Sequence, residues 1–149
     1  MAKLFNAVEP HKAYFGQKDA QQAAVIRQMT RDLNFPIEIV VCPTTREADG
    51  LAMSSRNVFL DAEHRKAATV LFRSLSAAKE LHDSGERDAE KLRGKMQAII
   101  GSEPLAQMQY VSCADYDTLE ELIVVKGKIL LSMAVMMGKT RLIDNFVLG

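Results

Sequence analysis

Residues 13–41, AYFGQKDAQQAAVIRQMTRDLNFPIEIVV, decide the fold class of this chain. Ala13 to Phe15 favours a short strand, and Asp19 opens a segment that is rich in helix formers. The β-branched residues between Ile37 and Val41 favour a second strand. A strand, a helix and a strand within about 30 residues predict a βαβ unit whose two strands run parallel.

The predicted helix has an apolar side that a core would cover. This side consists of Ala20, Ala23, Ala24, Ile26, Met29 and Leu33. Asn34 follows as a residue that tolerates the left-handed conformation found at helix ends. A shorter helix around Leu4 to Val8 precedes the unit and ends before Pro10.

The pattern changes after Pro43. Residues 43–57 form a polar loop without a helical or strand period, and long ordered loops are more often functional. Two helices should follow, with N-caps at Asp61 and Asp88. The inward side chains of the first are Ala67, Val70, Leu71, Leu75, Ala78 and Leu81. Strand-like segments come last, and the apolar run Ile129–Met137 suits a buried strand.

We therefore expect two parts, residues 1–43 and residues 44–149. The first is a fragment of an α/β layer, and the second combines helices with an antiparallel sheet, so the fold class passes from α/β to α+β. Two parallel strands are too few for a doubly wound sheet, so the first part is expected to be the end of a larger domain. Its apolar faces would then be exposed or covered by a partner, and a two-fold homodimer is the commonest solution.

Composition excludes several classes of protein. The chain has 149 residues, of which 48% are hydrophobic, with 19 basic and 19 acidic side chains. A zero formal charge disfavours general nucleic-acid binding, which depends on Lys and Arg neutralising phosphates. No apolar run reaches membrane-spanning length and no signal peptide is visible, so we expect a cytoplasmic protein without a membrane partner. Cys42 and Cys113 match no metal or redox spacing, and we interpret both as buried core thiols.

The first segment that could carry chemistry is a strand end that runs into a helix start. Gly16 would allow a ligand close to the backbone, and Lys18 offers a cation beside a helix N-terminus, where phosphates bind well. Asp19 could accept hydrogen bonds from sugar hydroxyls, and Gln22 offers a neutral donor and acceptor. The alternative is a capping box between Asp19 and Gln22, which needs no ligand.

The second segment lies in the polar loop. Ser54 and Ser55 place two hydroxyls directly before the guanidinium of Arg56, an arrangement that suits the oxygens of a polyphosphate. Such a site would stabilise negative charge as a phosphoanhydride breaks. The alternative is a solvated loop whose polar side chains bond only to the local backbone.

Taken together, these segments resemble a known family. Residues 16–22 (GQKDAQQ), 46–57 (READGLAMSSRN) and 140–145 (TRLIDN) resemble the pantothenate synthetase (pantoate–β-alanine ligase) family, over nearly the whole chain. The resemblance implies the end of a Rossmann-like nucleotidyltransferase domain followed by a small C-terminal lid domain. It also implies a two-step reaction in which pantoate and ATP, accompanied by Mg²⁺, form a pantoyl adenylate that β-alanine converts to pantothenate.

The resemblance implies a role for each matching residue. In the first segment, Gly16 lies against the nucleotide, Lys18 contacts the ATP phosphates and then the adenylate, and Asp19 holds the ribose. Gln22 binds pantoate. Lys18 is one of the catalytic candidates.

In the second segment, Ser54, Ser55 and Arg56 hold the phosphates and complete the catalytic set. Met53 packs nearby, and the backbone at Thr45 meets adenine. No resident metal site is implied.

One feature of the family is absent. The family carries a His-x-Gly-His motif on a preceding segment, whereas His11, His64 and His82 are the only histidines here. We expect His11 and His82 at the surface and His64 in a first helical turn. The chain alone should then be a weak or inactive catalyst. Two other functions stay open: another carboxylate-adenylating nucleotidyltransferase, and a non-catalytic nucleotide-binding or assembly module.

Overall fold

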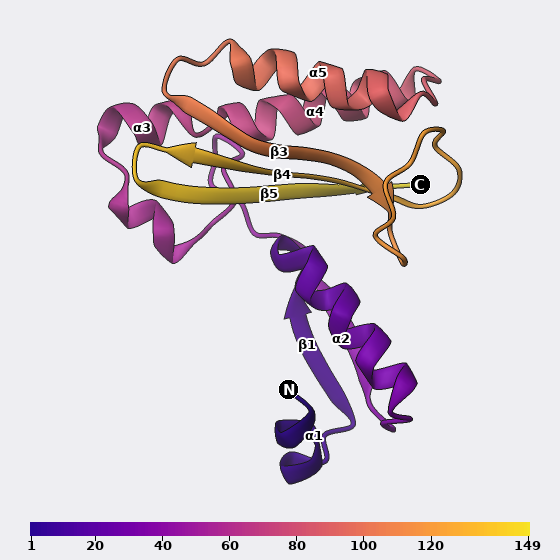
Figure 1. The fold of residues 1–149 in the computed structure, drawn as a ribbon. Coiled ribbons are helices and arrows are strands. Elements are labelled where there is room, and N and C mark those ends of the chain that lie inside the picture. Colours follow the sequence, from indigo (N-terminus) through magenta and orange to yellow (C-terminus); the bar gives the residue numbers. More distant parts are fainter. The chain divides into compact units, whose positions relative to one another are not determined.

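The computed structural model describes all residues 1–149 (Figure 1). The chain folds as two compact units, Met1–Thr44 and Thr45–Gly149. We refer to them as the N-terminal unit and the C-terminal unit.

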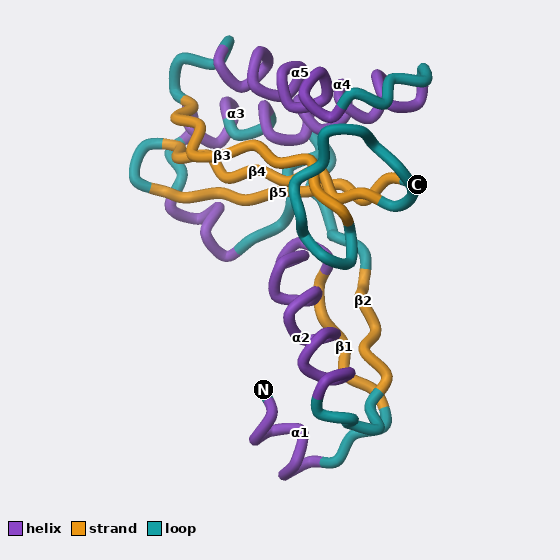
Figure 2. The backbone as a smooth tube through the Cα atoms, turned by 45° about the vertical axis from the view of Figure 1, so that its right-hand side comes forward, coloured by secondary structure: helices purple, strands orange, loops and turns teal.

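The N-terminal unit is a βαβ arrangement with one additional helix. Its elements are α1 (Ala2–Val8), β1 (Lys12–Gly16), the 3₁₀ turn η1 (Gln17–Asp19), α2 (Ala20–Asp32) and β2 (Glu38–Cys42). Strands β1 and β2 pair in parallel, with Gly16 opposite Cys42 at their carboxyl ends. Helix α2 runs alongside this pair (Figure 2). The predicted parallel βαβ unit is confirmed.

Helix α2 buries most of the apolar side that its sequence predicts. Ala20, Ala23, Ala24 and Ile26 are buried, and Met29 is partly buried. The prediction is wrong for Leu33, which is 55% exposed. The reason is that α2 ends at Asp32 and Leu33 leaves the helical path. Asn34 then adopts a positive φ of 51°, as expected of a residue that ends a helix in the left-handed region.

The C-terminal unit consists of helices packed on an antiparallel sheet. Its elements are η2 (Ser55–Phe59), α3 (Ala62–Ala67), α4 (Val70–Asp83), α5 (Ala89–Gly101), β3 (Ala106–Asp115), β4 (Ile129–Met137) and β5 (Thr140–Leu148). The three strands lie in the order β3-β4-β5. Helices α4 and α5 cover one face of this sheet (Figure 1). Alternate residues of β4 from Ile129 to Met137 join the helices in the core, which confirms the buried strand.

Both predicted helix N-caps in this unit are confirmed. The Asp61 carboxylate accepts a hydrogen bond from the backbone N–H of His64 at 2.9 Å, which places His64 in the first turn of α3 as expected. The Asp88 carboxylate accepts hydrogen bonds from the N–H groups of Glu90 and Lys91, at 2.9 and 3.3 Å. Each cap satisfies backbone donors that have no partner within the helix.

The prediction of one continuous helix after Asp61 is wrong. The helix breaks at Ala68 and Thr69, between α3 and α4. The Thr69 hydroxyl donates a hydrogen bond to the backbone carbonyl of Lys66 at 2.9 Å. Such a bond competes with the helical backbone pattern and favours a turn, which the apolar spacing does not reveal.

Two other side chains differ from expectation. Cys113 is buried as predicted, but Cys42, at the end of β2, is only partly buried. The side chain of His82 is 12% exposed rather than at the surface. It follows the fully buried Ala78 by one helical turn in α4, so both side chains point to the same side. No helix in this structure has the length and apolar character needed to cross a membrane.

Candidate functional site

The first candidate segment lies at the carboxyl end of the β1–β2 pair. Gly16 is the last residue of β1, and η1 carries Lys18 and Asp19 directly into α2. Gly16 is exposed, and a Cβ atom built there would meet no other atom within 4 Å. Gln22 is exposed in the first turn of α2. The four residues therefore gather where ligands bind in parallel sheets.

The capping-box interpretation of Asp19 is wrong. Asp19 stands at the N-cap of α2 with φ −97° and ψ 55°, and its side chain makes no capping hydrogen bond. The 3₁₀ turn η1 precedes the helix and holds Asp19 away from the extended conformation that N-caps usually adopt. The exposed Asp19 carboxylate therefore accepts no hydrogen bond from the backbone N–H groups at the start of α2.

The second candidate segment is more ordered than a polar loop without a period. Residues 45–53 fold back on themselves, with a bridge between Arg46 and Ala52. The N–H of Met53 donates to the carbonyl of Thr45 at 2.9 Å, so both residues stand together at the open end of this fold-back. The N–H of Glu47 donates to the carbonyl of Leu51 at 2.8 Å. We call residues 45–57 the serine loop; its last residues, from Ser55 on, belong to η2.

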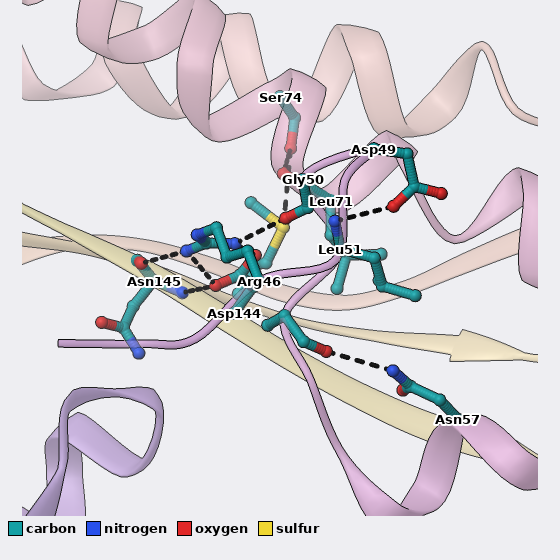
Figure 3. A network of polar contacts seen from close by, with 11 residues as sticks. Arg46, Asp49, Gly50, Leu51, Asn57, Leu71, Ser74, Asp144 and Asn145 are labelled. Atoms are coloured by element: carbon teal, nitrogen blue, oxygen red, sulfur yellow. Dashed lines mark hydrogen bonds and ion pairs between the residues drawn. The ribbon is translucent and has the colours of Figure 1, made fainter.

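Arg46 holds the base of the serine loop against β5. Its guanidinium forms two hydrogen bonds with the Asp144 carboxylate, at 2.7 and 2.9 Å. It also donates to the carbonyls of Gly50, at 3.0 Å, and of Asn145, at 3.4 Å (Figure 3). The side chain of Asp144 is 1% exposed and that of Arg46 18% exposed, so this ion pair is largely shielded from water.

Aromatic and apolar contacts complete the anchoring of the loop. The Arg46 guanidinium carbon lies 5.1 Å from the ring centre of Phe72 and 5.0 Å from that of Phe146. Gly50 has φ +90°, and a Cβ atom there would lie 2.1 Å from the Phe72 ring. Leu51 is 2% exposed and belongs to the hydrophobic core. The loop therefore fits against the core only with glycine at position 50.

The phosphate-binding candidates stand at the end of this anchored base. The Ser54 hydroxyl accepts the backbone N–H of Arg56 at 3.2 Å and caps η2. The Asn57 amide donates to the carbonyl of Ala52 at 3.2 Å and ties η2 to the loop. The side chains of Ser55 and Arg56 are exposed.

The structure thus gathers the predicted site residues into two groups. One holds Gly16, Lys18, Asp19 and Gln22 in the N-terminal unit; the other holds Thr45, Met53, Ser54, Ser55 and Arg56 in the C-terminal unit. Thr45 is exposed, and Met53 is 50% exposed. Within its own unit, each group presents polar atoms to the surface.

An ion pair with α3 braces the outer side of the serine loop. The Asp49 carboxylate accepts hydrogen bonds from the Arg65 guanidinium at 2.7 and 3.2 Å, and from the Leu51 N–H at 3.2 Å. The Arg65 guanidinium holds the pKa of Asp49 below its usual value, and the same contact raises the pKa of Arg65. The ion pair therefore favours the charged form of both groups.

Sequence reasoning missed the residues that support the loop. Arg46 and Asp144 are 98 residues apart, and no local pattern links them. The available signal is that both lie in segments that carry the family resemblance, residues 46–57 and 140–145. No group of three or more His, Cys, Asp or Glu side chains gathers in a way that could hold a metal ion.

Comparison with known proteins gives a consistent result. A family model described as pantoate-beta-alanine ligase matches residues 1–147. Pantothenate synthetase from Roseiflexus sp. is 61% identical over 148 residues, which cover 99% of this chain and 53% of that protein. The enzyme from Caldicellulosiruptor saccharolyticus is 54% identical and is covered to 52%. The chain therefore spans about half the length of the curated relatives it matches.

Solved structures agree with the sequence matches. The crystal structure of pantothenate synthetase from Thermus thermophilus aligns with a TM-score of 0.92 at 41% identity, covering 97% of this chain and 52% of that one. Pantoate-beta-alanine ligase from Francisella tularensis, complexed with beta-gamma ATP and beta-alanine, aligns with a TM-score of 0.63 at 30% identity. That alignment covers 98% of this chain and 47% of the other. The fold resembles the C-terminal part of these enzymes, and the chain belongs to the pantoate–β-alanine ligase family.

Proposed function

We propose that this chain forms the ATP-binding and lid portion of an ATP-dependent ligase that condenses pantoate with β-alanine. The observation that carries the proposal is the match of the family model to residues 1–147. The ligase structure with beta-gamma ATP and beta-alanine, at 30% identity, supports ATP and β-alanine as substrates. Residues 1–43 would complete a Rossmann-like domain, and residues 44–149 would act as the lid that excludes water.

The proposed reaction has two steps. A carboxylate oxygen of pantoate attacks the α-phosphorus of ATP, the bond from that phosphorus to the bridging oxygen breaks, and pyrophosphate leaves. The amine of β-alanine then attacks the acyl carbon of the pantoyl adenylate, AMP leaves, and the nitrogen loses a proton to form the amide. A carboxylate is a poor acyl donor, so adenylation supplies the leaving group, and the protein aligns reactants and stabilises phosphate charge.

The first group of residues would bind the nucleotide and pantoate. Lys18 supplies positive charge to the phosphates, and Asp19 accepts hydrogen bonds from the ribose. The open surface above Gly16 supports close approach of the nucleotide, because no atom would contact a Cβ atom there. Gln22, exposed in the first turn of α2, would donate to and accept from pantoate.

The second group would stabilise the charge that develops on the phosphates. Ser54, Ser55 and Arg56 would contact the phosphate oxygens, and the exposed guanidinium of Arg56 suits a bidentate contact. Met53 would pack against the nucleotide, and the backbone at Thr45 would meet adenine. We propose that Mg²⁺ arrives with the phosphates of ATP as part of the substrate.

We also propose a homodimer. Val25 in α2 is 63% exposed, Leu33 directly after α2 is 55% exposed, and Tyr14 in β1 is 65% exposed. Apolar side chains of this size on one unit favour association, and two-fold dimers are the commonest form. Sedimentation analysis at increasing concentration tests this point, and a monomer at every concentration would contradict it.

Pantoate-dependent exchange of pyrophosphate into ATP tests the proposed function. The chain is combined with the segment of the Roseiflexus sp. enzyme that it does not match, in trans or as a fusion. We expect exchange that requires pantoate, and little or none from the chain alone. Full exchange by the chain alone would contradict the expected inactivity.

Three other results would lead to different conclusions. Exchange that requires another carboxylate would identify a different adenylating enzyme. ATP binding without any exchange would indicate a non-catalytic nucleotide-binding module. A soluble, folded mixture that neither binds ATP nor exchanges pyrophosphate would overturn the proposal.

A further inference from the structure

We propose that Arg46 is a positioning residue: together with Asp144 it fixes the base of the serine loop, so that Ser54, Ser55 and Arg56 meet the phosphates in a productive geometry. The inference rests on the proposed function, because it concerns how that site is held. It assigns a role to Arg46 and Asp144, neither of which is among the residues proposed to bind substrate.

The contacts of Arg46 leave little of its hydrogen-bonding capacity unused. One terminal nitrogen donates to Asp144 at 2.7 Å and to the Gly50 carbonyl at 3.0 Å; the other donates to Asp144 at 2.9 Å and to the Asn145 carbonyl at 3.4 Å. The Phe72 and Phe146 rings, which meet edge to face with their centres 5.8 Å apart, lie against neighbouring sides of the guanidinium. A planar fork that bonds both carboxylate oxygens and two carbonyls is held in one orientation, so the arginine fixes the loop base in direction as well as in distance.

A short chain of contacts connects this base to the phosphate-binding candidates. Arg46 bridges to Ala52 across the fold-back, and the Ala52 carbonyl accepts the Asn57 amide at 3.2 Å. Asn57 lies in η2 beside Arg56, and the N–H of Asn57 donates to the Ser54 carbonyl at 3.0 Å. A shift of Arg46 would therefore move η2. The hydroxyls of Ser54 and Ser55 and the guanidinium of Arg56, at the start of η2, would move with it.

Lysine cannot replace this arginine in the same geometry. A lysine keeps the positive charge but lacks the planar fork, so it cannot bond both Asp144 oxygens and two carbonyls at once. The charge would remain near Asp144 while the loop loses its orientation. Arg46→Lys thus tests the orientation of the loop while the positive charge at position 46 is kept.

Arg93 provides a matched control within the same unit. Its side chain is 15% exposed, against 18% for Arg46. It likewise bonds a carboxylate, that of Glu121 at 2.9 Å, and a carbonyl, that of Leu122 at 3.1 Å. None of its hydrogen-bond partners lies in the serine loop. Arg93→Lys should therefore cost stability without moving the phosphate-binding candidates.

The kinetic test uses the complemented protein described above, at a temperature where all variants are folded. Because misplacing reacting groups by about 1 Å can reduce a rate about 100-fold, we expect Arg46→Lys to lower the exchange kcat by about that factor, with a smaller change in the KM for ATP. Asp144→Asn should behave in the same way. Arg93→Lys should keep the wild-type kcat, even if its unfolding temperature falls by as much as that of Arg46→Lys.

Hydrogen exchange on the chain alone gives a readout that needs no activity. In Arg46→Lys, the backbone N–H groups of Met53, Arg56 and Asn57 should exchange faster, while those of α5 and β3 keep their protection. In Arg93→Lys, the serine-loop amides should keep wild-type protection. Wild-type protection and kcat in Arg46→Lys, or an equal loss of kcat in Arg93→Lys, would overturn the inference. If the wild-type complemented protein shows no pyrophosphate exchange, the proposed function is refuted. Amide hydrogen exchange would then still decide whether Arg46 holds the loop.

Discussion

At the scale of single residues, Gly50 shows how closely the serine loop fits the core. Its φ of +90° is a conformation that L side chains rarely adopt, and a Cβ atom would lie 2.1 Å from the Phe72 ring. We expect Gly50→Ala to lower the free energy of unfolding by about 2–4 kcal/mol, from backbone strain plus steric overlap. Urea denaturation measures the change.

Gly85 is the matched control for Gly50. It also has a positive φ, +104°, but no atom lies within 4 Å of an added Cβ. Gly85→Ala should cost only the backbone strain, about 1–2 kcal/mol. If both variants lose the same free energy of unfolding, the overlap with the Phe72 ring does not contribute to the cost at position 50.

The buried thiol of Cys113 makes the stability of the chain depend on pH in the alkaline range. Burial raises the pKa of Cys113 to about 11, from an ordinary value of 9.0. Between these values the unfolded state loses the proton and the folded state keeps it, so the unfolded state binds fewer protons. The free energy of unfolding should therefore be unaffected by this group below pH 9 and fall above it, by up to about 1.4 kcal/mol per pH unit.

Comparison with Cys113→Ala isolates this contribution. Urea midpoints at pH 8, 9 and 10 should fall less steeply with pH in the variant than in the wild type, whatever the cost of the cavity. Parallel pH profiles in the two proteins would contradict the assigned burial effect.

Single residues also show where sequence reasoning reaches its limit. The Asp19 and Gln22 spacing predicts a capping box, but the turn η1 changes the backbone of Asp19 and no capping bond forms. The pairing of Arg46 with Asp144 depends on how β5 meets the loop, which no local pattern contains. Side-chain types predicted the candidate groups, and tertiary packing determines what supports them.

At the scale of elements, the N-cap of α5 offers a direct test of local stability. The Asp88 carboxylate accepts hydrogen bonds from two backbone N–H groups, at 2.9 and 3.3 Å. Asp88→Ala should lower the free energy of unfolding by about 1 kcal/mol, whereas Asp88→Asn should keep most of it because the amide oxygen still accepts. Denaturation of both variants checks this, and an equal loss in both would contradict the capping explanation.

Elements with strong local signals were predicted well. The β-branched run before Cys42 and the apolar run Ile129–Met137 form strands β2 and β4, because their side chains suit sheet surfaces that become buried. The break between α3 and α4 was not predicted. It depends on a hydrogen bond from Thr69 that interrupts an otherwise helical apolar spacing.

At the scale of the whole molecule, the chain carries two groups of candidate residues on two units. The parallel β1–β2 pair and the antiparallel β3-β4-β5 sheet were both predicted from strand patterns and connection lengths. The central proposal is that each group contributes to the binding of ATP. Lys18 and Asp19 would do so from the N-terminal unit, and Ser54, Ser55 and Arg56 from the C-terminal unit.

Calorimetric titration of the chain with MgATP tests this claim most directly. The wild type should bind one nucleotide per chain. Lys18→Ala in the first group and Arg56→Ala in the second should each weaken that same binding about tenfold, the loss expected for one charge-assisted hydrogen bond. Wild-type affinity in either variant would contradict the claim.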